Sequence, residues 1–204
     1  MSQSAERLIK VGSRVPRRRR GILPFLGLLF LRLSGWRVRG ELPDIPRAVL
    51  IAAPHTSFWD AVFGFAAIEA QRVKLNLLVK DVFFFWPLGW ILKKMGGLPV
   101  RTETPEGTVE QATERFQSRE KLFLAMAPEG TRMAPERWRT GFHHIARFAG
   151  VPIILVGLDY ARREVRVLET LDPGDDQEAD LQRIYNAFRS VAPRNPDWLS
   201  GPLR

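Results

Sequence analysis

Apolar runs of strand length alternate with amphipathic segments of helical length along most of the chain. The strand-like runs cover residues 47–53, 73–80, 98–101, 121–127 and 151–159, and the helix-like segments cover 57–70, 105–119, 141–149 and 177–192. A further apolar run at 164–168 predicts a hairpin with 151–159. This alternation indicates an α/β fold in which helices flank a mixed, largely parallel sheet.

An aromatic-rich segment at 83–95 interrupts this alternation. Its spacing predicts a helix that Pro87 perturbs. So many large apolar residues beside Lys93 and Lys94 predict one face in the core and one exposed face. An exposed apolar face rimmed by lysines suits contact with a membrane or with an acyl chain.

The excess of basic residues in a chain of net charge +9 lies in its first 40 residues. Residues 17–20 are all arginine and directly precede the apolar run 21–31. This run is too short to cross a hydrocarbon core, which needs about 20 helical residues, and no small-residue cleavage site follows it. We therefore expect an interfacial helix, with residues 14–35 meeting an anionic membrane surface. The alternative is a core helix preceded by a basic tail.

These features predict two parts of the chain. Residues 1–35 form a basic tail and membrane anchor, and residues 36–204 form one domain of a peripheral or monotopic protein on the cytoplasmic face of the membrane. The chain has no cysteine and three histidines without ligand spacing, so no metal site is expected. In the rest of the chain basic residues are balanced by acidic ones, so no nucleic-acid partner is expected. A basic protein that binds membranes or nucleic acid without catalysis remains the non-enzyme alternative.

His55 stands between the strand-like run 47–53 and the helix-like segment 57–70, and Asp60 follows it by five residues. Histidine is the side chain best suited to act as a base near neutral pH, and a carboxylate can fix its tautomer. Ser57 and Asp60 also fit a capping box at the start of a helix. The local pattern leaves the catalytic and the capping interpretation open.

A second polar stretch follows the strand-like run 121–127. It consists of Glu129, Gly130, Thr131 and Arg132. Glycine allows a tight turn, and a hydroxyl next to a guanidinium suits an anionic oxygen cluster such as a phosphate. On its own this stretch also fits an ordinary polar turn.

Four motifs occur in a fixed order along the chain, and a fifth segment accompanies them. They are "HTSFWD" (55–60), "GGLPV" (96–100), "APEGTR" (127–132), "GVPIILV" (150–156) and the accompanying "RTGFHHIA" (139–146). In this combination the chain resembles the glycerolipid acyltransferase family of lysophosphatidate (1-acylglycerol-3-phosphate) type over roughly residues 36–160.

The resemblance implies transfer of a fatty acyl group from acyl-CoA or acyl carrier protein to the hydroxyl of a lysophospholipid, in phospholipid biosynthesis. It implies His55 as general base, Asp60 as the group that holds it, and no cofactor beyond the thioester co-substrate. Residues implied to bind the acceptor are Glu129, Gly130, Thr131, Arg132, Arg101 and Arg139. A different lysolipid acceptor, or hydrolysis by the same His–Asp pair, is the alternative.

Three positions depart from the family pattern. Pro54 precedes His55 where many members have asparagine, Arg101 comes one position early, and Arg139 replaces a common lysine. A shift of one residue in a strand reverses the face of a side chain, which puts the role of Arg101 in question. For His143 and His144, within the helix-like segment 141–149, we expect a structural role. For His144 the alternative is that it lines the site, because its helix follows the loop of Glu129.

Overall fold

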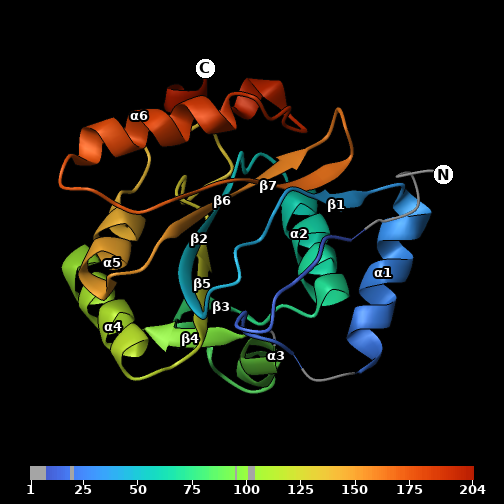
Figure 1. The fold of residues 1–204 in the computed structure, drawn as a ribbon, viewed down its shortest axis with the longest axis horizontal. Coiled ribbons are helices and arrows are strands. Elements are labelled where there is room, and N and C mark those ends of the chain that lie inside the picture. Colours follow the sequence, from blue (N-terminus) through green and yellow to red (C-terminus); the bar gives the residue numbers. More distant parts are fainter. Residues whose placement is uncertain (1–7, 19–20, 95, 101–103) are drawn as a thin grey trace.

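A computed structural model describes residues 8–18, 21–94, 96–100 and 104–204, and its centre is one seven-stranded sheet (Figure 1). The strands are β1 (Arg37–Arg39), β2 (Arg47–Ala53), β3 (Leu75–Lys80), β4 (Gly97–Val100), β5 (Leu122–Met126), β6 (Ile153–Asp159) and β7 (Glu164–Leu171). Their order is β1-β7-β6-β2-β5-β3-β4. The β6–β7 pair is antiparallel and the other described pairs are parallel. The predicted mixed, largely parallel sheet is confirmed.

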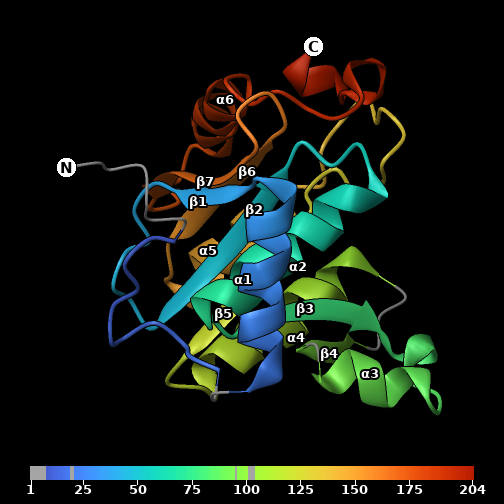
Figure 2. The ribbon, with the colours of Figure 1, turned by 90° about the vertical axis from the view of Figure 1, so that its right-hand side faces the viewer.

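Helices cover both faces of the sheet (Figure 1). They are α1 (Ile22–Ser34), α2 (Phe58–Gln71), α3 (Leu88–Lys94), α4 (Pro105–Gln117), α5 (Gly141–Ala149) and α6 (Gln177–Phe188), with 3₁₀ turns η1 (Asp81–Phe83), η2 (Pro196–Trp198) and η3 (Gly201–Leu203). Helices α4, α5 and α6 share one buried cluster with the sheet, and α1 and α2 share another. Figure 2 shows α1 in front of α2.

Strand β2 lies at the centre of the sheet, which explains its almost unbroken apolar sequence. Val49 and Ile51 point into the cluster formed with α4, α5 and α6. Ala48 and Leu50 point to the opposite face, where they meet Val15 of the N-terminal segment. A strand buried on both faces needs apolar side chains at successive positions.

The structure corrects several predicted boundaries. The aromatic segment 83–95 does not form one helix, because η1 ends at Phe83 and α3 begins at Leu88, directly after Pro87. Proline is well tolerated before or at the first turn of a helix but not in its interior. Strand β1 was not predicted, since it has three residues, and β7 extends beyond the predicted hairpin to Leu171.

Helix α1 packs closely against α2. A Cβ atom on Gly27 would lie 2.7 Å from the carbonyl oxygen of Ala66, so glycine permits this approach. Leu31 is buried in the same contact. Six apolar residues of α1 are exposed instead: Ile22, Leu23, Phe25, Leu26, Leu29 and Leu33. Among the described residues, no helix combines the length and apolar character that crossing a membrane requires.

Residues 8–18 of the basic tail also contact the domain predicted to begin at residue 36. Arg17 forms a bridge with Val73 at the start of the β3 region, and Arg18 pairs with Glu69 of α2 at 3.0 Å. Lys121 Nζ donates to the carbonyl oxygen of Ser13 at 2.9 Å. This part of the tail is therefore fixed on the protein, whereas Arg19 and Arg20 lie outside the described residues. The division into residues 1–35 and 36–204 stays a prediction.

Candidate active site

The two polar stretches meet because their strands are neighbours. In β2 and β5, Ile51 lies opposite Met126, so the loops that follow both strands leave the same edge of the sheet. The backbone N–H of His55 donates to Oε2 of Glu129 at 2.5 Å. Sites in open α/β sheets form beyond the carboxyl ends of the strands, and this contact lies there.

His55 faces Asp60 across the first turn of α2. Nδ1 of His55 lies 3.3 Å from Oδ2 of Asp60. The same Oδ2 accepts hydrogen bonds from the backbone N–H groups of Thr56 and Ser57, each at 2.7 Å. Ser57 is the N-cap residue, and its Oγ accepts from the N–H of Trp59 at 3.2 Å. The capping box and the His–Asp contact therefore coexist, and Asp60 takes part in both.

Asp60 is buried, and both of its oxygens are hydrogen-bonded. The hydroxyl of Tyr160 donates to Oδ1 at 2.6 Å. Burial, followed by the hydrogen bond and the negative charge of Asp60, raises the pKa of Tyr160 well above its ordinary value. The hydroxyl thus stays protonated at neutral pH and remains a donor. The guanidinium of Arg194 lies 5.8 Å from the Tyr160 ring centroid and 5.7 Å from that of Trp59.

Glu129 is buried beside His55, with 3% of its surface exposed. Burial raises the pKa of its carboxyl group, and the nearby Asp60 adds to this rise. The Ser200 hydroxyl, the N–H of His55 and the charge on the His55 ring oppose the rise. Within the part of the chain that the structure describes, Oε1 of Glu129 has no hydrogen-bond partner. The site therefore contains a buried oxygen atom able to accept a further hydrogen bond.

The remaining residues of the second stretch are exposed. Gly130 has φ +67°, a left-handed conformation that favours glycine. Thr131 and Arg132 are exposed beyond it. Arg139 packs its side chain against this turn, since a Cβ atom on Gly130 would lie 2.8 Å from Nε of Arg139. Cations thus flank the loop, while Arg101 lies outside the described residues.

Pro54 is the residue before His55 that departs from the family pattern. It is buried at the end of β2, and the peptide bond that joins it to Ala53 is cis. This position therefore belongs to the packed base of the loop.

Residues from the C-terminal part of the chain complete the site, and the sequence pattern did not identify them. Asn195 makes two hydrogen bonds to Thr56. Its backbone N–H donates to Oγ1 of Thr56 at 3.2 Å, and its Nδ2 donates to the carbonyl oxygen of Thr56 at 2.7 Å. Ser200 is buried near Glu129 and accepts from Nε1 of Trp138 at 2.8 Å. Tyr160 directly follows β6, which lies next to β2 in the sheet. The rule that sites form beyond the carboxyl ends of strands could therefore have identified it. Asn195 and Ser200 lie in irregular chain and carry no such signal.

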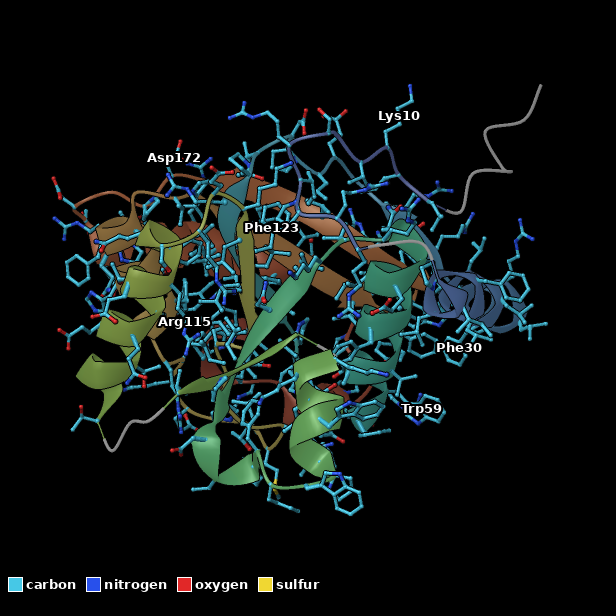
Figure 3. The ribbon with its side chains drawn as sticks, turned by 90° about the horizontal axis from the view of Figure 1, so that it is seen from below. Lys10, Phe30, Trp59, Arg115, Phe123 and Asp172 are labelled. Atoms are coloured by element: carbon cyan, nitrogen blue, oxygen red, sulfur yellow. The ribbon has the colours of Figure 1, made fainter. Side chains whose placement is uncertain are left out.

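Exposed aromatic side chains surround this edge of the sheet, and we call them the aromatic rim. They follow the carboxyl ends of β2 and β3 and comprise Phe58, Trp59, Phe83, Phe85, Trp86 and Trp90. Trp86 is the most exposed, at 88%. Nζ of Lys94 lies 3.8 Å from the Trp90 ring centroid. Phe30 of α1 and Trp59 (both labelled in Figure 3) pack against the same ring, that of Phe63, at 5.4 and 6.1 Å between centroids, so the rim borders α1.

The other two histidines lie on α5 and contact residues of α6. Nε2 of the buried His143 lies 2.8 Å from Oδ2 of Asp180, and Gln177 contacts both His143 and His144. These contacts join α5 to α6. The described residues contain no group of three or more His, Cys, Asp or Glu side chains arranged to hold a metal ion.

The chain was compared with known proteins. A family model described as acyltransferase matches residues 37–159, which include His55, Asp60 and Glu129 and end just before Tyr160. The crystal structure of the 1-acyl-sn-glycerophosphate (LPA) acyltransferase PlsC from Thermotoga maritima has a similar fold, with a TM-score of 0.58. The sequences are 16% identical, and the match covers 80% of this chain and 74% of that one. A search of curated proteins found no match.

Proposed function

This chain belongs to the acyltransferase family, and from that premise we propose that it transfers a fatty acyl group from a thioester to the hydroxyl of a lysophospholipid. The thioester is acyl-CoA or acyl carrier protein, and 1-acylglycerol-3-phosphate is the first acceptor to test. The observation that carries the proposal is the contact of His55 with both Asp60 and Glu129 at the carboxyl edge of the sheet.

The geometry supports a direct transfer with His55 as general base. Because Nδ1 faces Asp60, Nε2 is the ring nitrogen left to accept the proton of the acceptor hydroxyl. The hydroxyl oxygen attacks the thioester carbonyl, a C–O bond forms, and the C–S bond breaks. The imidazolium returns its proton to the departing sulfur. The substrate supplies the nucleophile, so no covalent enzyme intermediate is needed.

A phosphate on the acceptor suits the loop after β5. Arg132 and Thr131 are exposed there, and Arg139 packs on the same turn. Guanidinium groups bind phosphate oxygens in a bidentate manner, which orients the ligand as well as attracting it. We assign the acceptor's phosphate to Arg132 and Arg139. We assign its glycerol hydroxyl to the space beside His55 and Oε1 of Glu129, an oxygen without a hydrogen-bond partner among the described residues. Arg101 stays a candidate by resemblance alone.

The exposed apolar residues of α1 and the aromatic rim support docking on a lipid surface. A helix whose outward face is apolar gains free energy by burying that face, and the acceptor lipid resides in such a surface. Exposed Arg32, Lys93 and Lys94 lie next to these side chains and would meet anionic head groups. We therefore place the protein on the membrane as a peripheral component.

The test of the reaction is product identification. Purified protein would be offered labelled acyl-CoA or acyl carrier protein with a panel of lysolipids, and the lipids formed would be identified by mass spectrometry. We expect thioester consumption to depend on the acceptor and to be fastest with a phosphate-bearing one. Release of free fatty acid at the same rate without acceptor would instead establish a hydrolase. A preference for lysolipids without an exposed phosphate would overturn the assignment of Arg132 and Arg139.

The α1 surface makes a separate prediction. The double variant Phe25→Ser/Leu29→Ser should bind phosphatidylglycerol vesicles about 10²-fold more weakly or worse, since each apolar side chain contributes ~1.5–3 kcal/mol when fully buried. Vesicle flotation measures this. Phe148→Ser on α5 is the matched control, because Phe148 and Phe25 are each 63% exposed. Equal loss of binding in both variants would show that α1 is not the docking surface.

A further inference from the structure

Asp60 accepts hydrogen bonds from the loop of His55 and the start of α2. Beyond these two segments, Tyr160 is the only described side chain that donates a hydrogen bond to Asp60. Its hydroxyl reaches Oδ1, while Oδ2 is occupied by two backbone N–H groups and faces His55. Tyr160 directly follows β6 and lies 100 residues further along the chain than Asp60. It lies just beyond the segment that the family model matches.

We propose that Tyr160 is a positioning residue for acyl transfer, and that its hydroxyl holds the Asp60 carboxylate in the orientation that directs Oδ2 to Nδ1 of His55. The inference rests on the proposed function, since it takes His55 as the base. Tyr160 acts on His55 only through Asp60.

Packing holds the aromatic ring of Tyr160 in place, so its hydroxyl has a defined position from which to orient Asp60. Trp36 contacts it edge-on at 4.9 Å between ring centroids, and Phe63 does so at 6.1 Å. The N–H of Tyr160 donates to the carbonyl oxygen of Ala192 at 2.9 Å. Phenylalanine would preserve this packing, so replacing Tyr160 by phenylalanine removes the hydroxyl alone.

Removing the hydroxyl has two consequences for Asp60. Oδ1 becomes a buried acceptor without its donor, so the carboxylate no longer has one preferred rotation. Its negative charge also becomes less stabilised, and it holds the imidazolium form of His55 more tightly. The charged or titratable groups around this pair are His55, Glu129 and Arg194, and the substitution leaves all three in place.

The experiment measures acyl transfer by Tyr160→Phe over a range of pH. We expect kcat to fall about 10–100-fold with little change in KM, and the acidic limb of the pH–rate profile to move to higher pH. Tyr185→Phe is the matched control, because the chain has two tyrosines and Tyr185 packs edge-on against Trp138 at 5.1 Å rather than against the aromatic rings around Asp60. This control should keep the kcat and the profile of the wild type.

A double-variant cycle separates positioning from general support of the fold. In an Asp60→Asn background, Tyr160→Phe should cause little further loss of kcat, because the two residues act through one contact. Wild-type kcat and an unshifted profile in Tyr160→Phe, or losses that multiply in the cycle, would overturn the proposal. If His55→Ala kept full activity, the proposed function itself would fail, which is a different outcome from an inert Tyr160→Phe.

Discussion

His55→Ala is expected to lower kcat for acyl transfer by about 10²–10⁴-fold, the range that a general base contributes. In the proposed mechanism the substitution removes the ring nitrogen that accepts the hydroxyl proton, and the other two histidines contact Asp180 and Gln177 rather than Asp60. Thioester consumption in the presence of lysolipid, followed through the released thiol, measures the loss. KM for the acceptor should change far less than kcat.

The control for this variant is His144→Ala. His144 is partly buried on α5 and contacts Gln177, so its loss leaves the site untouched. Both variants should retain the circular dichroism of the wild type, because the His55 side chain is 27% exposed and its loss leaves Asp60 with three remaining donors. Full activity in His55→Ala would remove the basis of the proposed mechanism.

Asp60→Asn is expected to lower kcat by about 10²–10⁴-fold as well, and to lower the free energy of unfolding by roughly 1–3 kcal/mol. An amide offers one acceptor oxygen where the carboxylate has two oxygens receiving two N–H groups and a hydroxyl. The neutral amide also no longer stabilises the imidazolium of His55. Kinetics and urea denaturation measure the two effects separately.

Asp180→Asn is a matched control for this second prediction. Asp180 holds the buried His143 at 2.8 Å, so the chain contains a second His–Asp contact with no place in the proposed reaction. Its asparagine variant should lose stability through the contact between α5 and α6 while keeping kcat. If Asp60→Asn lost stability but kept kcat, the prediction would be wrong, and Asp60 would only cap helix α2.

Much of the fold follows from patterns that act over short distances. The observed bounds of β2 and α5 are the predicted ones, because an apolar run between polar turns marks a strand and glycine or proline marks the limits of a helix. The acyltransferase family and the mixed sheet are both confirmed. For the aromatic segment 83–95 a helix perturbed by Pro87 was predicted, and the structure confines the helix to the part after Pro87, because the apolar pattern continues through the proline while the helical backbone does not.

The part of the candidate site that follows two strand ends was predictable from the sequence. The part that comes from the C-terminal residues was not. His55 and Glu129 each follow a strand, so the rule for parallel sheets brings them to one edge. Asn195 and Ser200 reach the site from irregular chain, and only three-dimensional packing brings them to Thr56 and Glu129. The partner of a charged residue can be equally hard to predict. The sequence context of Arg18 suggests a lipid head group, whereas the structure pairs it with Glu69.

The close contact of α1 with α2 at Gly27 has a consequence for kinetics. Helix α2 has Asp60 in its first turn, so the proposed site and the apolar surface of α1 belong to one closely packed helix pair. A protein seated on a bilayer through that pair meets its acceptor by diffusion within a plane. The rate of acyl transfer then depends on the mole fraction of lysolipid in the bilayer. Adding inert phospholipid should lower this rate by surface dilution, even when the bulk concentration of lysolipid is unchanged.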